Sequence, residues 1–151
     1  MDNKIPFNTY MQYAIDEASL AINEVPVGAV VVKNNKIIAK GSNKMITKRD
    51  PTAHAEIEAI RNACLALGEY RLEDCSIYVT LEPCPMCAFA ISLARIKSIY
   101  IGAEDQKYGA ILNNIKIYNG NFTNHKPQVY DCIMKEECEL LLAKFFSNKR
   151  K

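Results

Sequence analysis

Two short segments, far apart in the chain, carry residue types that bind transition metals. The first is His54-x-Glu56, and the second is Cys84-x-x-Cys87. One histidine and two cysteines make three ligands, the number used by catalytic zinc sites that keep a fourth position for water. Any fold that serves these residues must bring both segments to one point, and this requirement constrains the architecture more than any other feature.

Both segments are expected at the start of a helix. Apolar residues recur at helical spacing after His54, at Ile57, Ile60, Cys64 and Leu67. This pattern predicts a helix over residues 53–67, with Thr52 as its N-cap. Cys84 and Cys87 lie three positions apart, on one face of the first turn of a helix expected over residues 85–95. Because a helix N-terminus favours anions, it lowers thiol pKa values and prepares thiolates for a metal.

The remaining patterns predict alternating helices and strands. We expect a helix over 8–24 with Asn8 as its N-cap, a hairpin of strands 27–32 and 36–40, strands over 76–81, 98–103 and 128–133, and a final helix from Met134. Residues 41–51 read as a loop, and residues 104–120 as a loop with a short helical piece. This order predicts an α/β fold whose mixed sheet of about five strands has helices on both faces. The length indicates a single domain over residues 1–151.

The composition says more about the cellular compartment of the protein than about its reaction. The net charge of +2 does not by itself require a nucleic-acid partner. The chain has no apolar run long enough to span a membrane and no pattern of a secretory signal, so we expect a cytoplasmic protein. Six cysteines in such a chain indicate a reducing compartment. Four of them lie outside the motif and are expected to be free core thiols: Cys64, Cys75, Cys132 and Cys138.

The motif residues suit a hydrolytic reaction. Ligand sites in open α/β sheets commonly lie at the carboxyl ends of strands, where two helix starts can aim the three ligands at one point. Zinc lowers the pKa of a bound water to about 7, so hydroxide exists near neutral pH. It can attack a ring carbon that bears an exocyclic amine. Glu56 would carry the protons and help the amine leave as ammonia.

Both halves together, H-x-E and P-C-x-x-C, form a signature typical of zinc-dependent nucleobase deaminases. The chain resembles this family over nearly its whole length, and most closely its tRNA adenosine deaminases. The more specific stretches are DPTAHAEI over 50–57 and GAEDQKYGA over 102–110. The resemblance implies a three-layer α/β/α cytidine-deaminase-like fold and one Zn²⁺ per subunit. It also implies a homodimer that converts the wobble adenosine of a tRNA anticodon loop to inosine.

The resemblance also implies roles for individual residues. The metal ligands are His54, Cys84 and Cys87, and Glu56 is catalytic. The expected substrate contacts are Asn43, Val27, Ala55, Leu81, Glu82, Pro83, Asp105, Lys107, Phe145 and Phe146. Asn43 would hydrogen-bond the nucleoside, Val27 would pack on the base, and Asp105 and Lys107 would face the RNA strand. Ordinary interpretations stay open, since Asn43 can shape a turn and Asp105 can cap a short helix.

The chain departs from the family at a few positions. Phe89 stands where a small residue is usual and Cys132 where glycine is usual, and Ile111-Leu112-Asn113 replaces small residues.

Two basic groups could contact phosphates or simply be solvated: Lys44, Lys48 and Arg49 near the expected pocket, and Lys144, Lys149, Arg150 and Lys151 at the end of the chain.

Three alternatives to the leading hypothesis follow from the same residues. A deaminase of a free base, such as guanine or cytosine, would use the same zinc chemistry. A non-enzymatic binding module stabilised by zinc would need no Glu56. A structural zinc site normally has a fourth protein ligand, and no second paired motif supplies one.

Overall fold

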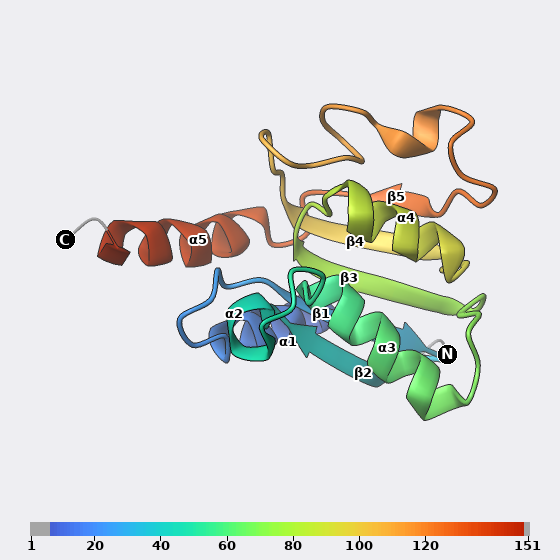
Figure 1. Ribbon diagram of the computed structural model, residues 1–151, viewed down its shortest axis with the longest axis horizontal. Coiled ribbons are helices and arrows are strands. Elements are labelled where there is room, and N and C mark those ends of the chain that lie inside the picture. Colours follow the sequence, from blue (N-terminus) through green and yellow to red (C-terminus); the bar gives the residue numbers. More distant parts are fainter. Residues whose placement is uncertain (1–6, 150–151) are drawn as a thin grey trace.

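A computed structural model describes residues 7–149, and a mixed five-stranded sheet forms its centre (Figure 1). The strands are β1 (Gly28–Lys33), β2 (Lys36–Ser42), β3 (Cys75–Leu81), β4 (Ser98–Ala103) and β5 (Gln128–Tyr130). Their order in the sheet is β2-β1-β3-β4-β5. The strand β1 is antiparallel to β2 and to β3, whereas β3, β4 and β5 run parallel. The parallel strands therefore end at one edge of the sheet.

Helices cover both faces of this sheet, so the expected three-layer arrangement is present. The helices are α1 (Phe7–Ser19), α2 (Met45–Lys48), α3 (Ala55–Leu67), α4 (Pro85–Leu93) and α5 (Lys135–Lys149), with a short 3₁₀ helix, η1 (Ile117–Asn119). One apolar core joins the sheet to α3 and α4, and a second joins the other face to α1 and the start of α5. Beyond its start, α5 extends away from the sheet (Figure 1).

The central strands are buried on both faces, which explains their continuous β-branched sequence. Val31 packs in the core beneath α3 and α4, whereas Val30 and Val32 pack on the α1 side. All three side chains are buried. Alternating side chains of β1 thus pack into two different cores. Because both cores are apolar, a strand made mainly of valine suits both.

A glycine lets α3 approach the end of β2. A Cβ atom added at Gly41 would collide with the carbonyl oxygen of Ala55 and the backbone nitrogen of Ala59. Any larger residue would push the first turn of α3 away from the sheet. Because this turn carries the H-x-E motif, Gly41 helps to fix the position of the metal-binding segment.

Several local predictions were wrong. Asn8 is not an N-cap, because α1 already includes Phe7. Thr52 does not cap α3, since its side chain bonds Asp50 and the helix begins after His54. The segment 41–51 is not all loop, because β2 extends through Ser42 and α2 follows.

The cysteines outside the motif differ in their surroundings. Cys75 and Cys138 are buried, as expected for core thiols, whereas Cys64 is half-buried. Cys132 is exposed, so its expected place in the core was wrong. Its φ of 60° lies in the left-handed region that glycine adopts most easily. Among residues 7–149, no helix is long and apolar enough to cross a bilayer.

Candidate active site

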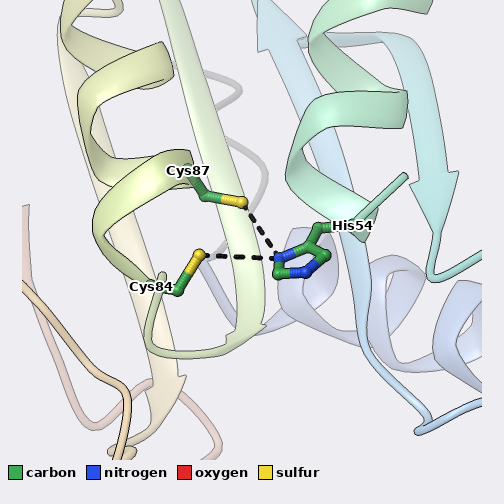
Figure 2. Close-up of side chains that lie close together, drawn as sticks. All are labelled: His54, Cys84 and Cys87. Atoms are coloured by element: carbon green, nitrogen blue, oxygen red, sulfur yellow. Dashed lines mark hydrogen bonds between the residues drawn. The ribbon is translucent and has the colours of Figure 1, made fainter. Parts of the chain in front are cut away.

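The three expected ligands meet at the starts of two helices on the same face of the sheet. His54 directly precedes α3 and Cys84 directly precedes α4, both with extended backbone. Cys87 lies in the first turn of α4 and is fully buried. Figure 2 shows the three side chains pointing toward one another.

The spacing of these atoms suits a tetrahedral metal. His54 Nδ1 lies 3.6 Å from Cys84 Sγ and 3.4 Å from Cys87 Sγ. All three ligand atoms lie within 4.8 Å of one another. With Zn–N and Zn–S bonds of about 2.0 and 2.3 Å at tetrahedral angles, nitrogen and sulfur would be about 3.5 Å apart. The residues therefore fit a zinc-sized ion. Within residues 7–149, no other group of histidine, cysteine or acidic residues meets this spacing.

The two thiols differ in acidity. Hydrogen bonds from Cys87 and then His54 lower the pKa of Cys84 to about 4, against the effect of burial. The hydrogen bond to Cys84, together with burial, raises the pKa of Cys87. The hydrogen bond between His54 and Cys84 raises the pKa of His54. The surroundings thus favour the thiolate form of Cys84, which is the form that binds a metal.

Glu56 lies beside the cluster, in the first turn of α3, with 4% of its surface exposed. Burial, and then the negative charge of Cys84, raises the pKa of Glu56 to about 7. A carboxyl group with a pKa near neutrality can both accept and donate a proton under physiological conditions. Glu56 is therefore suited to proton transfer, while the three ligands are suited to a metal.

A cavity of about 430 Å³ opens onto these residues. Nine of the residues predicted for the site line it: Val27, Asn43, His54, Ala55, Glu56, Leu81, Glu82, Cys84 and Asp105. The cavity brings together residues from five separate segments of the chain. A polar reacting centre at the base of an otherwise mainly apolar pocket is the usual form of a small-molecule or base-binding site.

Comparison with known proteins identifies the family. A family model described as MafB19-like deaminase matches residues 1–146. The chain belongs to this deaminase family. It is 44% identical over 144 residues to the tRNA-specific adenosine deaminase of Bacillus subtilis, a match that covers 94% of this chain and 89% of that protein.

Two solved structures are informative for this deaminase. One comes from studies of A-to-I editing by tRNA:A34 deaminases at the wobble position, with a TM-score of 0.87 and 44% identity over 89% of this chain and 99% of that one. The other is guanine deaminase from Bacillus subtilis, with a TM-score of 0.64 and 32% identity over 97% of this chain and 96% of that one. The first match places the chain in the cytidine-deaminase-like fold that the sequence predicted.

The other predicted site residues lie outside the deaminase cavity. Pro83 and Cys87 are buried and do not line it. Lys107 and Phe146 instead line an adjoining groove of about 790 Å³, which shares Leu81 and Asp105 with the cavity. Phe145 lines neither and packs edge-on against Phe146, with ring centroids 5.2 Å apart.

Sequence reasoning missed four residues that line the cavity: Val25, Met45, Pro85 and Tyr108. Each lies within two positions of a predicted site residue, so a wider window around each motif would have included all four. Tyr108 carries the clearest signal, because it is an aromatic residue between Lys107 and Gly109 in the stretch that the resemblance had already marked. Its side chain is 62% exposed.

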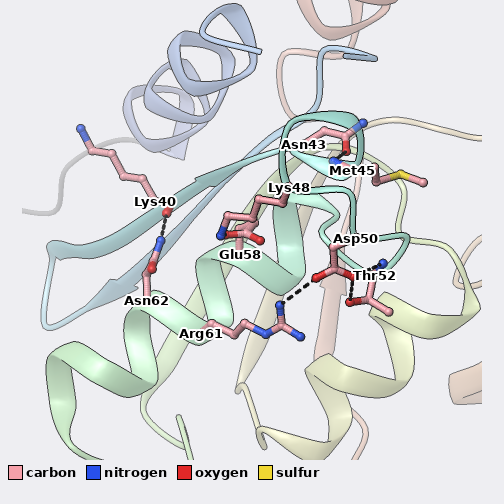
Figure 3. Close-up of polar contacts among 9 residues, drawn as sticks. All are labelled: Lys40, Asn43, Met45, Lys48, Asp50, Thr52, Glu58, Arg61 and Asn62. Atoms are coloured by element: carbon pink, nitrogen blue, oxygen red, sulfur yellow. Dashed lines mark hydrogen bonds and ion pairs between the residues drawn. The ribbon is translucent and has the colours of Figure 1, made fainter. Parts of the chain in front are cut away.

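Asn43 is partly engaged by its own turn (Figure 3). Its Nδ2 donates to the carbonyl oxygen of Val25 at 3.2 Å, and its Oδ1 accepts from the backbone N–H of Met45 at 3.3 Å. The expected turn-shaping role is therefore present. An amide has two donor hydrogens and two acceptor lone pairs, so Asn43 keeps capacity for a ligand in the cavity that it lines.

One of the three basic residues near the cavity is engaged in an ion pair. Lys48 pairs with the buried Glu58 at 2.7 Å, which ties α2 to α3 (Figure 3). Lys44 and Arg49 are exposed. In the terminal basic group, the Lys149 ammonium lies 4.9 Å from the ring centroid of Phe145, and Arg150 and Lys151 lie outside the described residues.

The Glu82 side chain organises the loop after β4. Its Oε1 accepts from the Asp105 N–H at 3.1 Å and from Asn113 Nδ2 at 2.6 Å. Its Oε2 accepts from the backbone N–H groups of Ile111, Leu112 and Asn113, at 3.1, 2.9 and 3.1 Å. Most of these contacts use the backbone, so they do not depend on which side chains stand at Ile111 and Leu112.

Proposed function

We propose that this chain is a zinc-dependent deaminase that converts the wobble adenosine of a tRNA anticodon loop to inosine and releases ammonia. One observation carries the reaction class: His54, Cys84 and the near-neutral carboxyl of Glu56 line one cavity, with Cys87 directly behind. The substrate class follows from the tRNA-specific relative at 44% identity and from the tRNA:A34 deaminase structure.

In this proposal His54, Cys84 and Cys87 hold one Zn²⁺, which when bound supplies an acidified water as nucleophile. Glu56 would accept one proton from the attacking water and deliver it to a ring nitrogen of adenine. It would then accept the proton of the hydroxyl newly bonded to the ring carbon and pass it to the amine, which leaves as ammonia. Val27 and Ala55 pack on the base, and the unused amide capacity of Asn43 serves the nucleoside.

The adjoining groove favours a polymeric substrate over a free base. It continues from the cavity past Leu81 and Asp105 to Lys107 and Phe146. A free base needs only the cavity, whereas an RNA strand extends beyond its reacting nucleotide and needs space and positive charge beside it. In this proposal Asp105, Lys107, Phe145 and Phe146 act on the flanking RNA, and Leu81, Glu82 and Pro83 shape the wall between the two hollows.

We further propose that the chain, as one domain, forms a homodimer in the cytoplasm, where its tRNA substrate would be found. The support is an apolar stripe on α4 formed by Met86, Phe89 and Leu93, which are 36%, 40% and 66% exposed. Their spacing places them on one helix face. An exposed apolar stripe of this kind commonly marks a protein interface.

The test is inosine formation in an anticodon stem-loop with a wobble adenosine, with free adenine, guanine and cytosine assayed in parallel. We expect inosine in the RNA and no ammonia from the free bases. The matched control is Glu56→Ala, which should keep zinc and lose inosine formation by at least a hundredfold, because general acid–base catalysis contributes about 10²- to 10⁴-fold.

Each result has a clear meaning. Ammonia from guanine with the RNA unchanged would replace the proposal with a free-base deaminase, the activity named for the Bacillus subtilis relative at 32% identity. Full activity in the Glu56→Ala variant would exclude the proton-transfer role. Zinc binding without any turnover would favour the non-enzymatic binding module.

A further inference from the structure

Tyr108 stands at the boundary between the two hollows. It lines the cavity that holds Glu56 and Cys84, and it also lines the adjoining groove. Its side chain is 62% exposed. Tyr108 is thus a large aromatic residue outside the core. It forms part of the wall of both the cavity and the adjoining groove.

The backbone holds Tyr108 in this position. Asp105 Oδ1 accepts from the backbone N–H groups of Lys107 and Tyr108 at 3.1 and 3.0 Å. The Gly109 N–H donates to the Asp105 carbonyl oxygen at 2.8 Å. Asp105 is itself fixed by Glu82, which is 2% exposed. The tight turn 105–109 therefore presents the Tyr108 ring from a rigid base.

The turn cannot easily move away from Glu82. A Cβ atom added at Gly109 would collide with the Glu82 carboxyl group and the Asp105 carbonyl oxygen. Gly109 thus allows the turn to lie directly on the buried carboxylate. The result is a fixed backbone position for Tyr108, so little backbone entropy is lost when its ring binds a ligand.

A positive charge accompanies the ring. The Lys107 ammonium lies 5.1 Å from the centroid of the Tyr108 ring. An aromatic ring next to a cation is the combination that binds single-stranded nucleic acid, since the ring stacks on a base and the cation meets a phosphate.

We propose that Tyr108 is a specificity-determining residue that stacks on the nucleotide next to the reacting adenosine. This inference rests on the proposed function. When one base leaves the stack to enter the cavity, its neighbour loses a stacking partner. The Tyr108 ring, at the mouth of the cavity, replaces that partner and keeps the flipped state populated. Lys107 meets the phosphate that joins the two nucleotides.

The experiment compares wild type with Tyr108→Ala, Tyr108→Leu and Tyr108→Phe on an anticodon stem-loop. We expect Tyr108→Ala to lower kcat/KM by about 5- to 150-fold, the range that loss of one base–aromatic stack gives. Tyr108→Leu should recover only part of this loss, and Tyr108→Phe should keep wild-type activity because it keeps the ring. Zinc content and the melting temperature should be unchanged, since the side chain is exposed.

A second substrate separates stacking from a structural effect. The same stem-loop is made with an abasic nucleotide on the 5′ or the 3′ side of the adenosine. On one of these RNAs, wild type and Tyr108→Ala should have equal kcat/KM, because the stacking base is gone. The side on which the difference disappears identifies the nucleotide.

The outcomes distinguish this inference from the proposed function. If wild type makes inosine and Tyr108→Ala matches it, only the inference fails. It also fails if the loss persists on both abasic RNAs, or if Tyr108→Phe is as impaired as Tyr108→Ala. If wild type acts only on free bases, the proposed function and the inference fail together.

Discussion

At the scale of single residues, His54 and Cys84 occupy positions where a helix normally has a capping side chain. Neither makes a side-chain cap bond to its own helix. Their side chains turn toward each other instead, at the N-terminal ends of two helices, where the helix dipole favours a thiolate. A missing N-cap costs about 1 kcal/mol. In the proposed function, a metal held by these residues would offset the cost of the two missing caps.

Metal binding should depend on Cys87. A Cys87→Ser variant replaces a buried soft ligand by a hydroxyl, which stays protonated and binds zinc poorly. We expect its zinc content, measured by mass spectrometry of the purified protein, to fall well below one ion per chain. Its melting temperature should also fall, because bound metal stabilises the folded state.

The matched control is Cys64→Ser, which makes the same chemical change at a half-buried thiol outside the site. It should keep its zinc. A Cys87→Ser protein that retains one tightly bound zinc would show that the ligand set is wrong.

Sequence reasoning predicts residues well where the chemistry depends on local spacing. His54, Glu56, Cys84 and Cys87 follow from two short motifs, and the structure brings them together. The loop contacts of Glu82 could not be predicted in this way, because they depend on a meeting between the end of β3 and a segment more than twenty residues later. Phe145 lines neither hollow, so its predicted contact with the flanking RNA stays a prediction.

At the scale of elements, α2 exists because distant side chains complete it. It has only four residues, too few for a helix to be stable by itself. Glu24 accepts from the N–H groups of Ile46 and Thr47 at 3.0 and 2.9 Å, and Lys48 pairs with Glu58. Periodicity over residues 41–51 carries no sign of these partners, which explains why a loop was predicted there.

The contribution of Glu24 should depend on pH. Burial alone would raise the pKa of Glu24, but the N–H groups of Thr47 and Ile46 outweigh it and lower the pKa below the ordinary 4.5. A lowered pKa in the folded state means stability that is present above the unfolded pKa and is lost as the pH falls through the folded pKa. At pH 7, Glu24→Gln should therefore be less stable than wild type by roughly 1–3 kcal/mol, the worth of hydrogen bonds to a charged group.

Urea denaturation at a series of pH values measures this difference. The gap between Glu24→Gln and wild type should shrink as the pH falls below 4.5. The exposed Glu69→Gln serves as the control and should match wild type throughout. A gap of constant size from pH 7 to pH 3 would show that the charge of Glu24 plays no part.

At the scale of the whole molecule, nothing within residues 7–149 covers the apolar stripe on α4. The helix α4 covers the sheet with Cys87, Ala88 and Ile91, and turns its Phe89 stripe outward. The alternation of strands and helices predicted the layers and the mixed sheet. The strand order β2-β1-β3-β4-β5 depends on pairings between distant segments, which local periodicity does not report.

The dimer should depend on this stripe. A Phe89→Glu/Leu93→Glu variant places two carboxylates where apolar contact is expected, and burying an unpaired charge is costly. Light scattering after gel filtration should give twice the chain mass of 17.0 kDa for wild type and the single mass for the variant.

Leu20→Glu is the control, since Leu20 is 66% exposed just after α1, on the opposite face of the sheet. It should remain dimeric. A wild-type protein of single mass at micromolar concentration would remove the homodimer from the proposal.

The loop bound to Glu82 also has a consequence for laboratory evolution. Asn114 adds to its bonds, with Nδ2 donating to the carbonyl oxygens of Gln106, Lys107 and Gly109 at 3.2, 3.4 and 2.8 Å. Residues 105–114 therefore have a fixed length, and an insertion or deletion there would break several bonds at once. A library that aims at new substrates should vary the side chains at 106, 107 and 108 and leave the length of this segment unchanged. Length variants belong after η1, where the chain returns to the surface.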